Sequence, residues 1–528
     1  MQLTFGLWIT VPRVGGNCWG ISLCDGFRTI RTDARTQSNQ FDEARQDTFE
    51  RRLAEAQAFG AASDGLSGQR PELSARHGLT IGQRLFGWLF VFAFVTSLFV
   101  ATRLTLAVSI TAIAAAFGAL IVIRFLAAAF ALAPRKAAAT PAVADAYLPV
   151  ITLLIPLYKE AAVLPDLLQA IGALDYPGHK LDVKLLIEAD DAETLGAIRE
   201  TGADARFEVI PAPPGAPRTK PKALNYGLHF ARGDLVAIFD AEDRPAPGQL
   251  RAAAAAFARG DKRLAVVQAP LNIHNGRDGW LAAQFEIEYA IHFRVWLPFL
   301  ARIGAPLALG GTSNFFRRDV LVEAGGWDAW NVTEDADIGL RLARLGYRAS
   351  MITPETDEEA PAKLKPWLNQ RTRWMKGYLQ TWLVLNRSPI KAARGMGLGN
   401  YLLTQVTLGG SLLAAMAHGP LLLWTAASAT TTTGIEAWHV ALFGLGYGSA
   451  LMAALASGMR RPAMLFTLPL YWPLQSVAMA RALYEMKRKP HHWAKTPHVA
   501  FKSATERLPS AQPEGMREDN VIQLPLPF

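Results

Sequence analysis

The sequence predicts an α/β domain with a mostly parallel sheet, placed between two blocks of membrane-spanning helices. Hydrophobic residues make up 51% of the 528 residues, and they gather before residue 135 and after residue 398. A more polar middle part is left between these blocks. In that middle part, short apolar runs alternate with helical patterns, which is typical of a parallel sheet covered on both faces. A chain of this length is expected to form more than one domain.

Charge and cysteine content exclude several classes of function. The formal net charge is +9, but many Lys and Arg residues flank apolar runs instead of gathering on one face, which argues against nucleic acid as a partner. The two cysteines, Cys18 and Cys24, form no CxxC pair, so a cysteine zinc site is not expected. The sequence also lacks a P-loop and the HExxH and GxSxG motifs.

Residues 1–80 are expected to be a mobile cytoplasmic leader, with one possible short helix near Asp47–Ala58. No positive segment precedes the apolar residues 2–12, so a signal peptide is not indicated. Residues 81–134 are expected to hold two membrane helices. Their apolar cores are Leu85–Ala101 and Leu104–Leu132, each long enough to cross a hydrocarbon core of ~30 Å.

Positive charges around these two helices predict their orientation. Arg103 stands in the short turn between them, whereas most of the basic residues lie on the outer flanks. The positive-inside rule therefore places both outer flanks in the cytoplasm. Arg124 lies within the second helix near its cytoplasmic end, and snorkelling toward the headgroups explains it better than a functional site does. The flanking residues are Arg76, Arg84, Arg135 and Lys136.

A soluble domain is expected over residues 148–352, after a linker at Pro141–Pro149. A helical pattern over Val163–Leu174 lies between the first two of its apolar runs. Because short apolar runs separated by helical patterns are typical of parallel strands, four strands are predicted. They are Ile151–Ile155, Val183–Ile187, Leu235–Phe239 and Leu264–Gln268.

The C-terminal part is expected to return to the membrane. Residues 353–396 are predicted to form interfacial helices, and residues 397–485 hold two clear spans. The segment Met464–Tyr484 is apolar enough to span, but basic residues flank both of its ends and two prolines interrupt it, so a re-entrant or interfacial helix and a fifth span both stay open. Residues 486–528 form a basic tail. The two clear spans are Asn400–Trp424 and Trp438–Met459.

Acidic residues follow three of the predicted strands. Glu160 follows the first strand, Asp190 and Asp191 follow the second, and the sequence Asp240-Ala-Glu-Asp243 follows the third. Ligands of open α/β sheets bind at the carboxyl ends of the strands. A single acidic turn is usually a solvated loop, but several carboxylates gathered at one edge repel each other unless a cation lies between them. Oxygen ligands favour Mg²⁺ or Mn²⁺. Such an ion, held by a few carboxylates and by phosphate oxygens, is the usual arrangement for binding a diphosphate.

Three further elements add candidate residues. Lys220 and Lys222 could bring positive charge to the same edge, although such lysines are often only surface residues. Thr333 is a good N-cap for a helix that would hold Glu334 and Asp335 in its first turn. The helix dipole favours ionised acids there, as a general base requires, but simple capping is the alternative.

The last candidate element is the segment Gln370-Arg-Thr-Arg-Trp374. On a helix, Gln370, Arg373 and Trp374 share one face. An aromatic ring beside hydrogen-bonding side chains suits a sugar ring. An amphipathic helix with its tryptophan at the headgroup level is the other interpretation, and both can hold together.

These elements, in this order, resemble the family 2 glycosyltransferases, and specifically their processive, cellulose-synthase-like membrane members. The resemblance covers about Leu148 to Trp382, and the ordered set of motifs is specific although each motif alone is weak. Two loops, Gly310–Asn314 and Gly325–Trp327, also look like family loops near the acceptor. The resemblance implies a GT-A-type sheet domain inserted between the N-terminal and C-terminal membrane helices.

The resemblance also implies a role for each matching residue. Asp335, with Glu334 beside it, would be the catalytic pair, in which Asp335 deprotonates the acceptor hydroxyl. The reaction would be one inverting displacement that gives a β-linkage. The nucleotide sugar would contact Tyr158, Glu160, Asp190, Asp191, Lys222 and Asp240; Mg²⁺ or Mn²⁺ would contact Asp240, Glu242 and Asp243; the diphosphate and the acceptor would contact Gln370, Arg373 and Trp374.

Two departures from the family pattern affect these expectations. The second acid of the DxD motif is Glu242, with Asp243 next to it, so either carboxylate could contact the metal. The segment after Pro490 is too short for the cyclic-dinucleotide-sensing domain of bacterial cellulose synthases. Another β-glycan therefore becomes a better expectation than cellulose.

The expected function is transfer of a sugar from a nucleotide sugar to a growing β-glycan. The enzyme is expected in the inner or plasma membrane, with its catalytic domain in the cytoplasm. UDP-glucose is the first candidate donor, and UDP-N-acetylglucosamine and GDP-mannose stay open, as does any export partner. A transferase that adds one sugar to a lipid or lipid carrier is the alternative, and a transporter or a non-catalytic membrane scaffold is a remote one.

Overall fold

The computed structural model describes residues 55–134, 143–201, 206–430, 437–459 and 461–493. The described residues 55–58 belong to a different unit, and the description below concerns the chain from Phe59 onward. The helix expected near Asp47–Ala58 begins outside the described residues, and residues 494–528 of the expected basic tail also lie outside them.

A seven-stranded sheet forms the centre of the soluble domain. Its strand order is β3-β2-β1-β4-β8-β6-β9, and every neighbouring pair is parallel except the two pairs that involve β8. All four strands expected from the sequence are present, and the predicted mostly parallel α/β architecture is confirmed. The strands are β1 (Ile151–Leu157), β2 (Leu181–Glu188), β3 (Phe207–Ala212), β4 (Leu235–Ile238), β6 (Leu264–Gln268), β8 (Asn314–Arg317) and β9 (Arg348–Met351).

Helices cover both faces of this sheet because alternate strand residues point to opposite sides. Leu185 and Ile187 of β2 belong to the main core, which α4, α5 and α7 complete. Leu186 points the other way and contacts α6, where a side chain on Gly227 would collide with it. The helices of this domain are α4 (Leu164–Gly172), α5 (Ala192–Glu200), α6 (Lys220–Leu228), α7 (Gln249–Arg259), α10 (Arg318–Glu323) and α11 (Glu334–Arg344).

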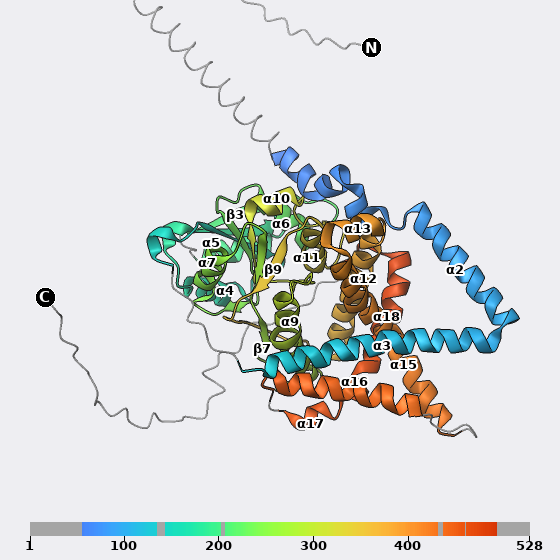
Figure 1. Cartoon of the computed structure of the whole chain (residues 1–528). Helices are drawn as coiled ribbons and strands as arrows, with labels where there is room; N and C mark the ends of the chain where they lie inside the picture. Colours follow the sequence, from blue (N-terminus) through green and yellow to red (C-terminus); the bar gives the residue numbers. More distant parts are fainter. Residues whose placement is uncertain (1–54, 135–142, 202–205, 431–436, 460, 494–528) are drawn as a thin grey trace, which may run out of the picture. The chain divides into compact units, whose positions relative to one another are not determined.

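The strand order brings the acidic segments together. Strands β2, β1 and β4 are adjacent and parallel, so the residues that follow them meet at one edge of the sheet. Strand β8 runs antiparallel to β4, with Asn314 paired to Ile238. Its entry loop, residues 310–313, therefore lies at that same edge. Figure 1 shows the sheet and the helices around it.

A small second sheet extends the domain beyond the expected boundary at residue 352. Its order is β5-β10-β7, from β5 (Arg244–Pro245), β10 (Thr356–Glu358) and β7 (Leu271–Ile273). Strand β10 thereby places Glu358 beside the segment that follows β4. Helix α8 (Trp280–Ile291), the π-helical turn η5 (His292–Trp296) and α9 (Leu297–Arg302) follow β7.

Apolar helices flank the sheet domain at both ends of the chain. Among the residues that the structure describes, four helical segments are long and apolar enough to cross a membrane, by length and composition. They are α2 (Ile81–Val100), α3 (Thr102–Leu132), the stretch Leu398–Ser428 and α16 (Ala437–Ala456). Helix α3 packs along α16, and α15 packs along α18 (Figure 1). The stretch from Leu398 consists of α14 (Leu398–Thr404), the π-helical turn η6 (Gln405–Gly409) and α15 (Gly410–Ser428).

The segment Met464–Tyr484, which the sequence leaves open, forms the end of α17 (Pro462–Leu465) and most of α18 (Leu468–Arg488). It is not among the four apolar segments. Helix α18 packs against α15 and against α12 (Leu364–Leu385), and Lys376 of α12 donates a 3.1 Å hydrogen bond to Glu485. Helix α13 (Pro389–Met396) connects α12 to the membrane stretch.

The described end of the expected leader does not lie free of the domain. Residues 59–78, here called the N-terminal strap, pack against the loop 325–331 that precedes α11. Ser74 Oγ and the backbone N–H of Ala75 donate to the two carboxylate oxygens of Asp328, at 2.8 and 2.5 Å. The Arg76 guanidinium lies 4.7 Å from the ring centre of Trp330. The strap therefore supports the segment that leads to Asp335.

Replacing Asp328 with alanine is expected to destabilise the protein by about 3 kcal/mol, because buried donors from the strap and the backbone N–H of Trp330 lose their acceptor. Thermal unfolding of the purified chain measures this effect. Asp175→Ala is the control, since it removes an exposed ion pair with Arg251 and should cost less than about 1 kcal/mol. Equal stability of the two variants would contradict a supporting role for the strap.

Candidate active site

A cavity of about 980 Å³ lies where the acidic edge of the sheet meets the helices. The ends of β1, β2 and β4, the start of α11 and one face of α12 form its wall in the sheet domain. Helices α8 and α9 with η5 between them, and residues of α3, α15, α16 and α18, form much of the rest of the wall. The cavity therefore extends from the sheet edge to the apolar helices. Its acidic residues are Glu160, Glu188, Asp240, Glu242, Glu288, Glu334, Asp335 and Glu358.

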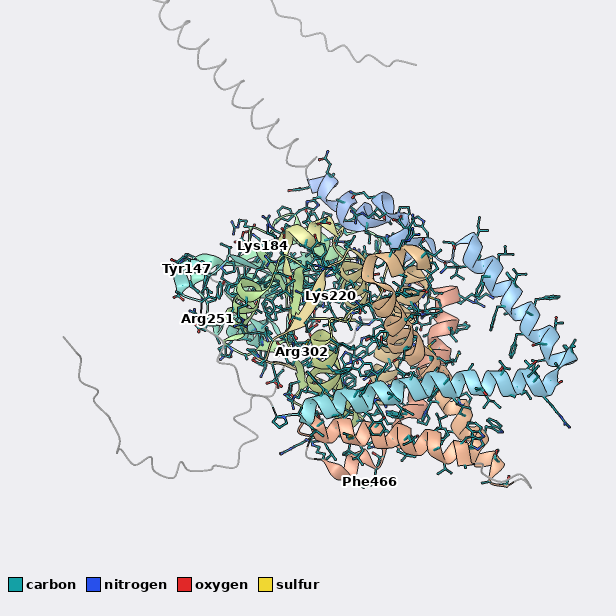
Figure 2. All side chains as sticks on the ribbon, viewed as in Figure 1. Tyr147, Lys184, Lys220, Arg251, Arg302 and Phe466 are labelled. Carbon is teal, nitrogen blue, oxygen red and sulfur yellow. The ribbon has the colours of Figure 1, made fainter. Side chains whose placement is uncertain are left out.

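Asp240 forms an ion pair with Lys220 at the edge of this cavity. Lys220 stands at the start of α6 and also donates a 2.7 Å hydrogen bond to the carbonyl oxygen of Gly311. Burial lowers the pKa of Lys220, but the charges of Asp240 and Glu334 outweigh it and raise the pKa above its usual value. Lys220 thus stays a cation among the carboxylates, and its side chain is marked in Figure 2.

Glu242 and Glu358 add further acidity beside Asp240. Burial and the charge of Asp240 raise the pKa of Glu242 to about 8. Burial and the charge of Glu242 raise the pKa of Glu358 to about 8 as well. These carboxylates would ionise more readily with another cation among them.

This donor set fits a hard divalent ion. Asp240 and Glu242 both line the cavity, and carboxylate oxygens are preferred by Mg²⁺ and Mn²⁺. No group of three His, Cys, Asp or Glu side chains is placed to hold a metal among the residues that the structure describes. Asp240 and Glu242 would hold such an ion together with phosphate oxygens and water, as is usual for Mg²⁺.

Asp243, the third expected metal ligand, does not line the cavity. Its side chain is buried and accepts hydrogen bonds from the backbone N–H of Asp240, at 2.6 Å, and from the Thr312 hydroxyl. Asp243 therefore joins the segment after β4 to the loop before β8. Of the two neighbouring acids that the sequence could not separate, Glu242 is the one at the cavity.

The expected nucleotide-binding residues divide into two groups. Tyr158 and Glu160 line the cavity. Asp190 is half-exposed and forms a 2.7 Å ion pair with Arg218, which does line the cavity. Asp191 is buried instead and caps α5 by accepting a hydrogen bond from the backbone N–H of Thr194.

Lys222 is also turned away from the cavity. It is fully buried and forms a 2.8 Å ion pair with Glu188. Side chains two positions apart on a helix differ in direction by about 200°. Lys220 and Lys222 therefore cannot face the same side. The sequence analysis considered Lys220 only as a possible source of positive charge, but it is the lysine that lines the cavity.

Glu334 and Asp335 form the start of α11, as expected, and both line the cavity. Thr333 holds the N-cap position, but its side chain makes no capping hydrogen bond. The effect expected from the helix start is opposed by the surroundings of Asp335. Burial raises the pKa of Asp335 above its usual range, and the opposing effects of Lys220 and Arg373 are smaller. Burial and the charge of Asp335 raise the pKa of Glu334 to about 7.

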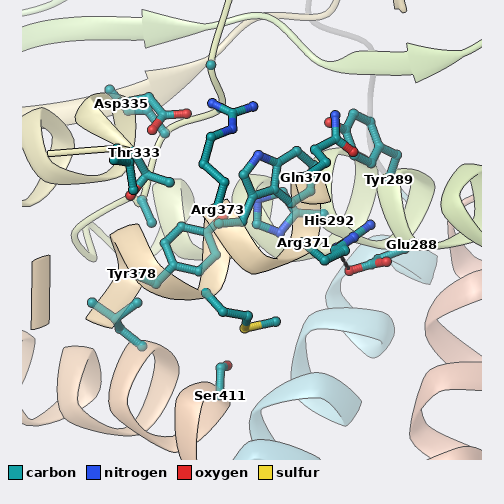
Figure 3. Close-up of a pocket in the computed structure, with 18 of the residues that line it drawn as sticks. Glu288, Tyr289, His292, Thr333, Asp335, Gln370, Arg371, Arg373, Tyr378 and Ser411 are labelled. Atoms are coloured by element: carbon teal, nitrogen blue, oxygen red, sulfur yellow. Dashed lines mark hydrogen bonds and ion pairs between the residues drawn. The ribbon is translucent and has the colours of Figure 1, made fainter. Parts of the chain in front are cut away.

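Gln370, Arg373 and Trp374 all line the cavity from α12. Figure 3 shows Arg373 extending toward Asp335, with Gln370 further along the same helix. Trp374 stacks on Tyr289 with a centroid distance of 6.3 Å. One face of α12 thus supplies a cation near the carboxylate and an aromatic surface beside it.

Arg371 is a cavity residue that the sequence analysis missed. It donates a 2.6 Å hydrogen bond to Glu288, and its guanidinium lies 4.6 Å from the ring centre of Trp374. Glu288 also accepts a 2.8 Å hydrogen bond from the Tyr471 hydroxyl of α18. Its position two residues before Arg373 was the available signal, whereas Glu288 belongs to no motif.

The sheet, its acidic edge and the flanking apolar helices have the arrangement expected of a GT-A-type glycosyltransferase domain. Residues 149–377 match the family model described as "Glycosyltransferase like family 2". The chain therefore carries a family 2 glycosyltransferase domain, and the resemblance seen in the sequence is confirmed for this domain.

Several curated proteins are similar to this chain. A probable glycosyltransferase, YdaM of Bacillus subtilis (strain 168), is 28% identical over 44% of this chain and 55% of its own length. The β-monoglucosyldiacylglycerol synthase of Trichormus variabilis is 27% identical over 52% and 61% of the two chains. The probable glucomannan 4-β-mannosyltransferase 6 of Oryza sativa subsp. japonica is 28% identical over 43% and 41%. The matches thus span 41% to 61% of the length of these relatives.

Among solved structures, the mannosyltransferase PcManGT from Pyrobaculum calidifontis, in complex with GDP-Man and Mn²⁺, is 22% identical. The match has a TM-score of 0.48 and covers 71% of this chain and 97% of that one.

Proposed function

We propose that this protein is a membrane-bound inverting glycosyltransferase that transfers a sugar from a nucleotide sugar to a growing β-glycan. The observation that carries the proposal is the shape of the cavity. It holds Asp240 and Asp335 at the sheet edge and continues between helices apolar enough to cross a membrane. An acceptor chain in this cavity would have its end at the carboxylates and its older units toward the membrane helices.

Asp335 is the proposed general base. As the acceptor oxygen bonds to the anomeric carbon of the donor, its proton passes to an oxygen of Asp335. The bond between that carbon and the diphosphate oxygen breaks, and the nucleoside diphosphate leaves. Arg373 and Lys220 place positive charge near Asp335 and Glu334, which limits the repulsion between the two acids and the diphosphate.

Asp240 and Glu242 are the proposed ligands of Mg²⁺ or Mn²⁺, which would neutralise charge on the departing diphosphate. Tyr158 and Glu160 are the proposed contacts of the nucleoside, with Asp190 and Arg218 close by. Asp191, Lys222 and Asp243, which do not line the cavity, are proposed to support the segments around it.

Gln370, Arg373 and Trp374 are the proposed contacts of the diphosphate and the acceptor end. The Trp374 ring, which lines the cavity beside Tyr289 and Arg371, is the proposed aromatic contact of a sugar ring. UDP-glucose is the first donor to test, followed by UDP-N-acetylglucosamine and GDP-mannose.

Basic residues on the outer flanks of α2 and α3 support a cytoplasmic position of the sheet domain. The four apolar segments indicate association with a membrane. The inner or plasma membrane is the proposed location, because nucleotide sugars are supplied from the cytoplasm.

A second candidate function is transfer of a single sugar to a lipid. The apolar walls that α3, α15 and α16 give the cavity favour it, since they could hold acyl chains. The length of the product separates the two functions.

The test uses the purified full chain in nanodiscs with Mg²⁺ or Mn²⁺ and each radiolabelled nucleotide sugar in turn. Label in high-mass material from one donor supports glycan synthesis and names the sugar. Label only in a small lipid-extractable product supports the second function. Absence of label with every donor, in membranes as well as in nanodiscs, contradicts both.

As the pH is lowered, the rate of transfer is expected to begin to fall at a higher pH than it would with an ordinary aspartate as the base. A base acts only when deprotonated, and burial raises the pKa of Asp335 above the usual value of about 3.9. The acidic limb of the kcat profile should therefore lie above pH ~4. In Arg373→Gln the limb should move further upward, because the charge of Arg373 lowers this pKa. A limb at or below pH ~4 would argue against Asp335 as the base.

A further inference from the structure

Arg124 of α3 lies in the wall of the cavity, at its membrane end. It stands eight residues before the end of α3 at Leu132, which is about 12 Å along the helix. The sequence suggested that this side chain snorkels toward the headgroups. Instead, Nη1 donates a 3.2 Å hydrogen bond to Ser449 of α16, and the guanidinium lies 5.5 Å from the ring centre of Trp472 of α18.

No carboxylate lies within ion-pair distance of Arg124 among the residues that the structure describes. Both of its contacts, the Ser449 hydroxyl and the Trp472 ring, are neutral. Among the described residues with which α3, α15, α16 and α18 line the cavity, Arg124 is the only Asp, Glu, Lys or Arg. Arg371, in the same cavity, is different, because Glu288 neutralises it at 2.6 Å.

An arginine among apolar helices without a counter-charge is unfavourable, and such residues mark the position of a ligand or an ion path. A neutral sugar would not require this charge, since serine or glutamine can bind hydroxyl groups without it. Gln475 lines the same part of the wall, and its buried Oε1 has no hydrogen-bond partner among the described residues. Two polar side chains of this wall thus have bonding capacity that the chain itself leaves unused.

We propose that Arg124 binds an anionic group of the acceptor, a phosphate or a carboxylate, at the membrane end of the cavity. That the bound molecule is the acceptor depends on the proposed function, whereas the anion site itself is inferred from Arg124 and its surroundings. A lipid phosphate and an acidic group on a glycan share this chemistry. In either case, the anion supplies the missing counter-charge and holds the acceptor at a fixed distance from Asp335.

The test measures equilibrium binding to the full chain in a non-ionic detergent with two pairs of probes. The lipid pair is fluorescent phosphatidic acid and the equally labelled diacylglycerol. The glycan pair is a β-linked tetrasaccharide of glucuronic acid and the corresponding tetrasaccharide of glucose. Wild-type protein is expected to bind the anionic member of at least one pair tenfold more tightly or better. The lipid pair alone identifies a lipid phosphate, and the glycan pair alone identifies an acidic sugar.

Arg124→Met is expected to reduce that preference to threefold or less. Methionine suits an apolar surrounding, so the variant should fold, and Arg124→Gln serves as a second neutral replacement. Arg124→Lys should keep most of the preference. Arg103→Gln is the matched control, because Arg103 is exposed on the same helix and its loss should change nothing.

Equal binding of the anionic and neutral probes by wild-type protein in both pairs would overturn the inference. So would a preference that persists in both neutral variants. Sugar transfer is measured separately on the same preparations. Lack of transfer from every donor contradicts the proposed function but leaves an Arg124-dependent anion preference standing, so the two failures are distinguishable.

Discussion

Replacing Asp335 with asparagine is expected to lower kcat by a factor of about 10²–10⁴, the usual contribution of a general base. Asparagine keeps the size of the side chain and can still accept the 2.8 Å hydrogen bond that the backbone N–H of Ala336 donates. It cannot take the proton of the acceptor hydroxyl. Donor binding should change little, because the charge lost lies on the acceptor side. Single-turnover transfer measures the chemical step directly.

Asp319→Asn is the matched control for this variant. Asp319 also stands in the first turn of a helix and accepts a 2.9 Å hydrogen bond from the next backbone N–H, but it is exposed and outside the cavity. Its replacement should leave kcat unchanged. If Asp335→Asn retains wild-type kcat while folding normally, another group is the base, and Glu334, with its pKa raised to about 7, becomes the first candidate.

Asp240→Asn is expected to reduce kcat/KM by at least about 10²-fold at fixed metal concentration, because a removed transition-state charge contact costs on this order. The variant loses one of the two proposed metal ligands and also the partner of Lys220. The half-saturating concentration of Mn²⁺ should rise. Titration of transfer activity with Mn²⁺, after treatment with a chelator, gives both quantities.

Asp234 provides the control for Asp240, since the two residues flank the same strand. Asp234 precedes β4 at the opposite edge of the sheet and is exposed. Asp234→Asn should keep the wild-type dependence on Mn²⁺. A chelator-treated wild-type enzyme with full activity, or an Asp240→Asn variant with unchanged Mn²⁺ dependence, would remove the metal from the proposed site.

The sequence was sufficient for the parts of the fold that follow from continuous apolar runs. Strands β1, β2, β4 and β6 are buried over most or all of their length, so each appears as a mostly apolar run. Strand β8 has only Phe315 and Phe316 between polar residues, and the strands of the second sheet have two or three residues each. Such segments carry no periodicity, and only pairing with distant strands makes them extended.

The candidate site was predictable where residues stand at the end of a buried strand or the start of a helix. Asp240, Glu242 and Asp335 belong to this group. The choice between neighbours was not predictable, because Asp243 and Lys222 differ from the cavity residues Glu242 and Lys220 only in direction. Glu358 escaped notice since it comes from β10, beyond the expected end of the domain.

The N-terminal strap has a consequence for how events in the cavity can be followed. Arg387, just beyond α12, donates hydrogen bonds to the carbonyl oxygens of Pro71, Ser74 and Gly78, at 2.9, 2.7 and 2.6 Å. Helix α12 also carries Gln370–Trp374, so a displacement of this helix by a substrate must stretch those bonds or carry the strap with it. Protease cleavage and amide hydrogen exchange across residues 70–79 should therefore report occupancy of a cavity that these residues do not line.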